Sequence, residues 1–161
     1  MIIQGSDVRQ FLPQFLEHFE ALTCDDRYNR FFHTMSPEAI RDWLLSIEGR
    51  GNEKHLFIVV IDESDAYLHG RFVGIAQIAI HTDTMDGDVA VSVIPEFQKR
   101  GIGTQMLQES IRMAREAKLH SLHFNCEMQN HKCRDLYTKM GFISAYNPAE
   151  YCICGTLQLG E

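Results

Sequence analysis

The amino-acid sequence predicts a single α/β domain over residues 1–161, with a mixed, mostly antiparallel sheet of about seven strands and about four helices. Three observations predict this fold class. A length of 161 residues suits one domain with one sizeable core. Three β-branched segments, 55–61, 71–80 and 88–94, follow one another with only turns between them, as in an antiparallel meander. A glycine loop and a helical pattern then bring the next strand in parallel.

Before the meander, the pattern predicts a short strand and two helices. Residues 2–3 suggest the strand, and apolar residues at spacings of three and four over 8–22 give one continuous helical face. Pro13 within that face should kink the helix or mark its true start. Residues 25–33 are expected as a polar turn leading into aromatics, after which Ser36, followed by proline, caps the second helix.

After the meander, helices and strands alternate. The Asp-Gly pair at 86–87 is a hairpin signal between the second and third strands of the meander. The later elements are a helix over 102–117, a strand over 121–126, a helix capped by Asn130 and ended by Gly141, and a closing hairpin over 142–146 and 151–159.

Charge and hydropathy exclude several classes of partner. Fifteen Lys and Arg against 22 Asp and Glu give a formal charge of −7, which repels nucleic acid and anionic membranes and mildly favours a cationic acceptor. No apolar run is long enough to span a bilayer, and the start lacks the basic region and apolar core of a signal peptide. We therefore expect a cytoplasmic protein without nucleic-acid or membrane partners.

The cysteines favour a reducing compartment and no metal. Five cysteines are an odd number without the spacing of a disulfide framework. Cys152 and Cys154 are expected on one face of a strand. No Cys-x-x-Cys pair occurs, and the metal-binding types of the central region fall in different elements, so a zinc site there is disfavoured. Those residues are His120, His123, Cys126, His131 and Cys133.

The loop between the third meander strand and the following helix is a candidate phosphate site. The first N–H groups of a helix have no internal partner and lie at the positive end of its dipole, so an anion placed there gains several hydrogen bonds. Gly101 and Gly103 let the backbone approach a ligand closely. A dinucleotide fingerprint would need a third glycine at Met106, and the Gly-Lys-Ser/Thr of a Walker loop is missing.

Two stretches resemble the GNAT superfamily of acyl-CoA-dependent N-acyltransferases. The run Gln-Lys-Arg-Gly-Ile-Gly at 98–103 resembles its pyrophosphate signature, Gln/Arg-x-x-Gly-x-Gly/Ala. The stretch 130–142 is similar to its second cofactor element, with matches at Asn130, Leu136, Tyr137, Lys139, Gly141 and Phe142. A weaker resemblance, Asp-Arg-Tyr-x-Arg-Phe-Phe followed by Ser-Pro-Glu, links residues 26–38 to the branch that includes bacterial protein-lysine acetyltransferases.

The resemblance implies a fold, a cofactor and a set of contacts. It implies the GNAT fold, a mixed sheet with helices on both faces, in which the two central parallel strands splay apart where the thioester enters. It also implies acetyl-CoA or a related acyl-CoA as co-substrate, with its pyrophosphate on the glycine loop. The cofactor-binding residues would be Val93, Ile94, Gln98, Lys99, Arg100, Gly101, Ile102, Gly103, Thr104, Asn130, Lys132 and Tyr137.

The same resemblance suggests catalytic roles. Tyr137 stands where family members often place a tyrosine beside the CoA sulfur, and its phenol would be the general acid for the departing thiolate. Asp88 matches the acidic base of the lysine-acetylating branch, although aspartate is one methylene shorter than the glutamate usual there. The alternative bases are Glu127, His81, and Ser92 acting through water.

The expected reaction is N-acetyl transfer to a primary amine by direct attack in a ternary complex. The acceptor would be a small amine or a protein lysine, held by residues 15–33, the turn at 81–86 and the last hairpin. An alternative from another class is a non-catalytic acyl-CoA-binding sensor, and an unrelated nucleotide-binding module is a third, disfavoured by the missing glycine. Exposed strand edges are compatible with a homodimer.

Overall fold

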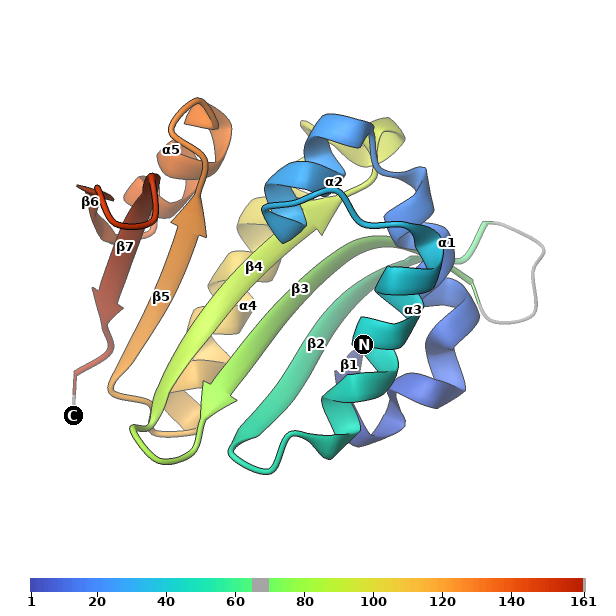
Figure 1. Cartoon of the computed structure of the whole chain (residues 1–161), viewed down its shortest axis with the longest axis horizontal. Coiled ribbons are helices and arrows are strands. Elements are labelled where there is room, and N and C mark those ends of the chain that lie inside the picture. The colour runs from blue at the N-terminus through green and yellow to red at the C-terminus, as the bar shows by residue number, and fades with distance from the viewer. Residues whose placement is uncertain (65–69, 161) are drawn as a thin grey trace.

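The central feature of the structure, a computed structural model that describes residues 1–64 and 70–160, is a mixed sheet (Figure 1). Its seven strands within that part of the chain run in the order β1-β2-β3-β4-β5-β7-β6. Every neighbouring pair is antiparallel except β4 and β5. The mixed, mostly antiparallel sheet predicted from the sequence is confirmed. The strands are β1 Ile2–Gln4, β2 Glu53–Asp62, β3 Arg71–His81, β4 Asp86–Val93, β5 Ser121–Cys126, β6 Ile143–Asn147 and β7 Cys152–Gln158.

Helices cover both faces of the sheet. Two consecutive residues of β2 point to the two layers. Phe57 contacts Phe15 of α1, whereas Ile58 packs with Met106 of α4. Figure 1 shows α1, α2 and α3 in front of the sheet and α4 behind it. The described part of the chain has five α-helices, α1 Leu12–Ala21, α2 Cys24–Phe31, α3 Pro37–Ser46, α4 Ile102–Glu116 and α5 His131–Lys139.

Two local predictions need correction. Residues 25–33 were expected as a turn, but α2 occupies most of them because the Thr23 hydroxyl caps the helix by accepting the N–H of Asp26 at 3.0 Å. The hairpin turn lies at residues 82–85, one step before the Asp-Gly pair, because Met85 adopts a left-handed conformation with φ of 57° and β4 already begins at Asp86.

Pro13 marks the start of the first α-helix, which was one of the two outcomes expected for it. It lies at one of the first two positions of α1, where a missing N–H costs no internal hydrogen bond. The preceding apolar residues form a short 3-10 segment, η1 Gly5–Phe11. Phe15 and Phe19 of α1 are fully buried against the sheet. This packing fixes the layer from which α2 projects over β4.

The parallel pair β4 and β5 opens like a wedge. The two strands pair only over Asp86–Asp88 and Ser121–His123, whereas β5 continues to pair with β7 along its whole length. Beyond Asp88, β4 keeps its pairing to β3 and leaves β5. The splay that the resemblance implied is therefore present, and it leaves unpaired backbone on the facing edges of both strands. No helix in residues 1–64 and 70–160 has the length and hydropathy needed to cross a membrane.

Candidate active site

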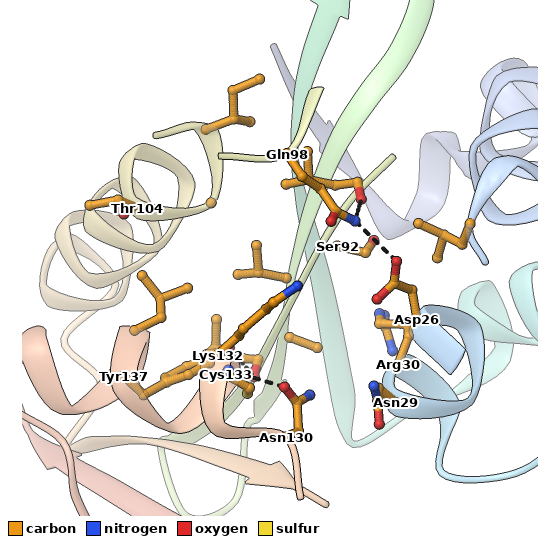
Figure 2. Close-up of a pocket in the computed structure, with 18 of the residues that line it drawn as sticks. Asp26, Asn29, Arg30, Ser92, Gln98, Thr104, Asn130, Lys132, Cys133 and Tyr137 are labelled. Atoms are coloured by element: carbon orange, nitrogen blue, oxygen red, sulfur yellow. Dashed lines mark hydrogen bonds between the residues drawn. The ribbon is translucent and has the colours of Figure 1, made fainter. Parts of the chain in front are cut away.

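A cavity of about 340 Å³ lies where β4 and β5 separate. It is bounded by α2 on one side and by the glycine loop, α4 and α5 on the other, with β4 as its floor (Figure 2). The floor consists of residues 89–93, the part of β4 that has left β5. The cavity therefore has a loop wall, formed by residues 97–104 and α5, and an α2 wall.

The loop wall presents the start of α4 without a side-chain cap. Gly101 is the N-cap residue, with φ of 81°, and no side chain accepts a hydrogen bond from the first turn. The first hydrogen bond of the helix joins the N–H of Gln105 to the carbonyl of Gly101 at 3.0 Å. The N–H groups before Gln105 are therefore available to an anion, as the sequence predicted for this loop.

Gln98 holds the loop against the floor and the opposite wall. Its Nε2 donates to the carbonyl of Val93 and to Oδ2 of Asp26, both at 3.0 Å. Figure 2 shows this side chain reaching from the loop toward α2. Lys99 lies beside it and lines the cavity. Lys99 has a positive φ of 59°, so two residues of the loop, Lys99 and Gly101, adopt the left-handed conformation.

Helix α5 supplies the lower part of the loop wall. Asn130 caps it, with Oδ1 accepting the N–H of Cys133 at 3.1 Å, which confirms the cap predicted from the sequence. Lys132 lines the cavity, and Figure 2 shows its side chain crossing the opening. Cys133 and Leu136 also line the cavity and were not among the predicted contacts.

Tyr137 lies where α5 meets the floor. Its ring stacks on Phe124 of β5 with centroids 4.0 Å apart, and its hydroxyl donates to the carbonyl of Val89 at 3.2 Å. The contact is long for an O–H donor, so this hydroxyl can exchange partners at small cost. Burial raises the pKa of Tyr137 well above its ordinary value, and the phenol therefore remains protonated and able to donate.

Ser92, on the floor, forms a buried pair with His18 of α1. The His18 ring contacts the carbonyl of Phe72 through Nδ1 at 2.9 Å and Oγ of Ser92 through Nε2 at 2.8 Å. A carbonyl only accepts, so Nδ1 carries the proton, Nε2 accepts, and the Ser92 hydroxyl donates to it. Burial lowers the pKa of His18 to about 4, which keeps the ring neutral. The Ser92 hydroxyl oxygen keeps its two lone pairs as acceptors, and Ser92 lines the cavity.

The α2 wall consists of polar side chains one helical turn apart. Asp26, Asn29 and Arg30 line the cavity from successive positions on one face of α2 (Figure 2). The Arg30 guanidinium donates to Oε1 of Gln77 on β3, and burial lowers its pKa to about 10. No glycine or other backbone signal marks this group. In the sequence, Asp26 and Arg30 fall in the stretch 26–38 that resembles the branch of bacterial protein-lysine acetyltransferases, but placing them on one helix face depends on recognising α2.

Five predicted site residues are not among the described residues that line the cavity. The N–H of Ile94 already donates to Val73 at 3.0 Å, and its side chain is fully buried in the core. Arg100 donates instead to the carbonyl of Glu96 at 2.7 Å, with its guanidinium 4.7 Å from the Phe97 ring centroid. The other three are the candidate bases Asp88, Glu127 and His81. The remaining ten cofactor-binding candidates line the cavity.

The geometry does not favour Asp88 as the base. Asp88 lies at the closed end of the wedge, and its Oδ2 accepts from Nε2 of His81 at 2.8 Å. That hydrogen bond is the main reason why the pKa of His81 is raised. A base must reach the attacking amine directly or through one water, and this pair lies outside the cavity. Of the four candidate bases, Ser92 is the one among the cavity-lining residues.

Of the three regions expected from the sequence to hold the acceptor, one lines the cavity and two do not. Residues 22–32 of the expected segment 15–33 contribute to the cavity, through Leu22, Phe32 and the α2 wall. The turn at 81–86 and the last hairpin contribute none of the lining residues in the described chain. The α2 wall is therefore the part that can contact an acceptor in this structure.

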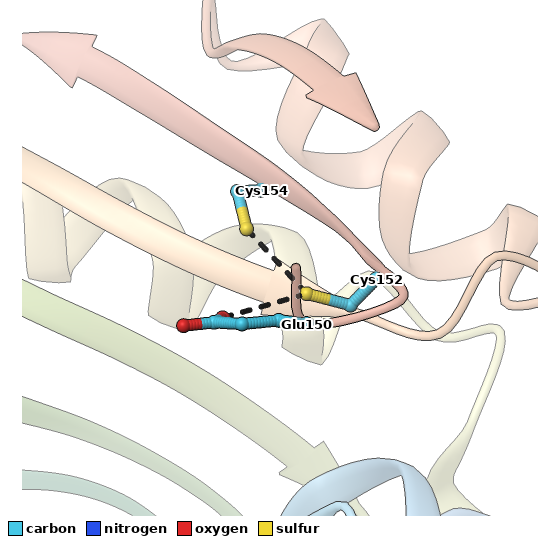
Figure 3. Close-up of side chains that lie close together, drawn as sticks. All are labelled: Glu150, Cys152 and Cys154. Atoms are coloured by element: carbon cyan, nitrogen blue, oxygen red, sulfur yellow. Dashed lines mark hydrogen bonds between the residues drawn. The ribbon is translucent and has the colours of Figure 1, made fainter. Parts of the chain in front are cut away.

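A second side-chain cluster lies at the start of β7 and in the turn before it. Cys152 and Cys154 lie on one face of the strand with sulfur atoms 3.4 Å apart, and Glu150 approaches Cys152 at 3.8 Å (Figure 3). Their three candidate ligand atoms lie within 4.8 Å of one another. Burial and its neighbours raise the pKa of Cys152 to about 12, whereas a metal binds the thiolate. The pair is better described as two thiols that fill the strand face.

Together, the fold and the cavity define an α/β domain with a splayed parallel strand pair and an uncapped helix start on the cavity wall. The family model described as "Acetyltransferase (GNAT) family" matches residues 16–142, which is most of the chain. The chain therefore belongs to the GNAT family, and it is an acetyltransferase of that type, as the two sequence stretches predicted. A search of curated proteins gives no match.

Solved structures with the same fold include three acetyltransferases of different kinds. The GNAT domain of S. lividans PAT has a TM-score of 0.73 and 15% identity, covering 92% of this chain and 85% of that one. The ribosomal-protein-S5-alanine acetyltransferase of Vibrio fischeri has a TM-score of 0.70 and 17% identity, covering 100% of this chain and 92% of that one. A spermidine N-acetyltransferase variant from Vibrio cholerae has a TM-score of 0.64 and 13% identity, covering 99% of this chain and 95% of that one. At these identities the likeness concerns the fold.

Proposed function

We propose that this protein transfers an acetyl group from acetyl-CoA to a primary amine by direct attack in a ternary complex. One observation carries the proposal. The uncapped start of α4 opens into a cavity that follows the splayed edge of β4 and ends at the hydroxyl of Tyr137. A site with anion-binding amides at one end and a buried hydroxyl donor at the other suits a phosphate-bearing thioester.

The loop wall would bind the cofactor. The N–H groups at 101–104 would bind the pyrophosphate, with Lys99 and Lys132 adding positive charge from the two sides. The edge of β4 at Val93 is open to the pantetheine arm on the side from which β5 has departed.

The chemistry needs a neutral amine and a hydrogen-bond donor for the leaving sulfur. When bound, the thioester supplies a carbonyl carbon that an amine nitrogen can attack. One N–C bond forms, the C–S bond breaks, and the proton that nitrogen loses balances the proton that sulfur gains. Ser92, with its hydroxyl proton directed to His18, would accept a hydrogen bond from the amine. Tyr137 would turn its hydroxyl from Val89 to the sulfur and act as the general acid.

The first test is a calorimetric titration with acetyl-CoA of the wild type, Gly101→Asp and a matched control, Gly160→Asp. Both glycines have positive φ, 81° and 73°, and a side chain at either position would meet no atom within 4 Å. The two variants therefore carry similar backbone strain and the same added charge. We expect Gly101→Asp to weaken binding by on the order of 100-fold and Gly160→Asp to leave it unchanged.

The outcomes decide the proposal. Equal binding by both folded variants would show that the loop does not hold the cofactor. Release of CoA thiol on adding primary amines would then establish transfer in a protein that passes the first test.

A second candidate is an acyl-CoA sensor that binds without transfer. The observation in its favour is that the acidic residue matching the base of the lysine-acetylating branch, Asp88, lies outside the cavity and is paired with His81. Tight acetyl-CoA binding without thiol release, across a panel of amines from pH 7 to 9, would favour this sensor.

The solved neighbours support an amine acceptor without narrowing its class. Their names describe acetylation of spermidine and of an alanine of ribosomal protein S5. A finer assignment of the acceptor class has to be argued from the residues that line the cavity of this chain.

A further inference from the structure

Arg30 is a cation on the cavity wall without a carboxylate partner. None of the ion pairs among the described residues includes it. Its Nε atom is buried and has no hydrogen-bond partner in that part of the chain. A buried charge is costly unless it is paired, so an unpaired guanidinium beside a cavity points to a negative partner that enters from the cavity.

The guanidinium is held in place before any ligand binds. It lies 5.8, 5.0 and 5.5 Å from the ring centroids of Phe19, Phe31 and Trp43. Its Nη2 donates to Gln77, whose amide in turn contacts His55 at 2.8 Å. The aromatic faces offset part of the desolvation but accept no directed hydrogen bond in the plane of the guanidinium. The donors that remain on Nη1 and Nη2 suit a bidentate acceptor such as a carboxylate.

The phosphates of CoA do not explain this cation. The cations on the loop wall are Lys99 and Lys132, beside the start of α4. Arg30 lies on α2, across the cavity from Thr104 in Figure 2, on the wall opposite the start of α4. Asp26, the one acidic residue that lines the cavity in the described chain, is hydrogen-bonded to Gln98 instead.

We propose that Arg30 binds a carboxylate of the acceptor, so that the acceptor is an amine that also carries a carboxylate, as a free amino acid does. This inference rests on the proposed acetyl transfer and names its substrate class. It also separates the local charge from the charge of the whole chain. A net charge of −7 acts at long range and weakly favours cations, whereas Arg30 acts at contact distance inside the cavity.

The test compares acceptors that differ only in the carboxylate. Each standard amino acid is assayed against the amine that remains when its carboxylate is removed, for example lysine against 1,5-diaminopentane, with thiol release as the readout. We expect the preferred amino acid to exceed its amine by on the order of 100-fold in kcat/KM, because a desolvated charge pair is lost without the carboxylate. In Arg30→Gln that ratio should fall to about 1.

Two further variants separate binding from folding. Arg30→Lys keeps the charge without the planar fork and should give an intermediate ratio. Arg27→Gln is the matched control, because Arg27 is on the same helix, donates to the carbonyls of Glu20 and Leu22, and does not line the cavity. It should leave the ratio unchanged. Circular dichroism and thermal unfolding confirm that each variant is folded.

The source of the carboxylate is tested in a separate arm with succinyl-CoA in place of acetyl-CoA. A preference for succinyl-CoA that Arg30→Gln removes would assign the carboxylate to the acyl group and overturn the inference. Equal rates for amino acids and their amines, or a preference that survives in folded Arg30→Gln, would also overturn it while leaving acetyl transfer intact.

Binding provides a readout that does not need turnover. Amino acids and their amines are titrated by calorimetry into protein saturated with CoA, with wild type and Arg30→Gln in parallel. Carboxylate-dependent binding lost in the variant supports the inference, and its absence in the wild type contradicts it. Failure of the proposed function would be seen separately, as a lack of acetyl-CoA binding or of thiol release with every acceptor.

Discussion

The two walls of the cavity both begin with a helix start, but they use it differently. On the loop wall, Gly101 leaves the first amides of α4 without a cap, so the backbone itself is the proposed binding surface. On the α2 wall, the Thr23 hydroxyl caps the helix, and the binding surface consists of the side chains of Asp26, Asn29 and Arg30. A backbone site needs glycines at fixed positions and is visible in the sequence. A side-chain site needs only polar residues on one face of a helix, and it is harder to recognise in the sequence.

The difference extends to what supports each wall. The loop wall depends on local geometry, with two residues of positive φ and one side chain, Gln98, that ties the loop to Val93. The floor beside the α2 wall depends on a long-range polar contact, between His18 and Ser92, 74 residues apart. Such contacts exist only after the chain has folded, so conditions that break them should affect this side of the cavity first.

The largest predicted effect is a loss of stability in acid, through His18. The unfolded histidine titrates near 6.5 and the folded one near 4, so the unfolded chain takes up its proton first as the pH falls. The contribution of the neutral ring is therefore complete above pH 6.5 and is lost between 6.5 and 4, to a total of about 3 kcal/mol. Urea unfolding at pH 7 and 4.5 measures it.

His18→Gln provides the comparison for this prediction. An amide can still donate to Phe72 and accept from Ser92, but it does not titrate. The variant should lose less stability than the wild type between pH 7 and 4.5, by about 2.5 kcal/mol. Equal acid sensitivity of the two proteins would show that another group is responsible and that His18 does not set this dependence.

The second effect is on catalysis, at Tyr137, where α5 meets the floor of the cavity. Tyr137→Phe removes the hydroxyl and keeps the ring on Phe124, so we expect kcat to fall on the order of 100-fold with the affinity for acetyl-CoA nearly unchanged. Tyr28→Phe, on the exposed side of α2, is the control. An unchanged kcat would remove Tyr137 from the reaction and leave it as part of the core.

The smallest effect concerns Asp88, at the closed end of β4 and outside both walls. Asp88→Asn should change kcat/KM less than about 3-fold, because an exposed pair with His81 contributes little and does not line the cavity. The pKa of His81 should fall, since the Asp88 carboxylate is its main raising influence, and an NMR titration measures this. A 100-fold loss of activity would restore Asp88 as the base.

The sequence predicted the fold well because its signals are local. Alternating β-branched runs, the Asn130 cap and the glycine loop each depend on a few neighbouring residues, and the elements they define occur in the structure. Helix α2 was missed because it is short, polar and has no buried residue, so its apolar periodicity is absent. Its start signal is Thr23 with aspartates two and three residues later, and this signal is weak without that periodicity.

The candidate site divides along the same line. The sequence alone determined the family, the glycine loop before α4 and the cap of α5, because backbone conformation at Gly101 and Asn130 is encoded by the residues themselves. Tertiary structure alone decided that Asp88 pairs with His81 outside the cavity and that Ser92 meets His18. It also decided that Arg30 faces the cavity from α2, beside Gln77 of β3. These contacts join segments far apart in the chain, and their geometry is set by strand register and helix packing, which no local pattern contains.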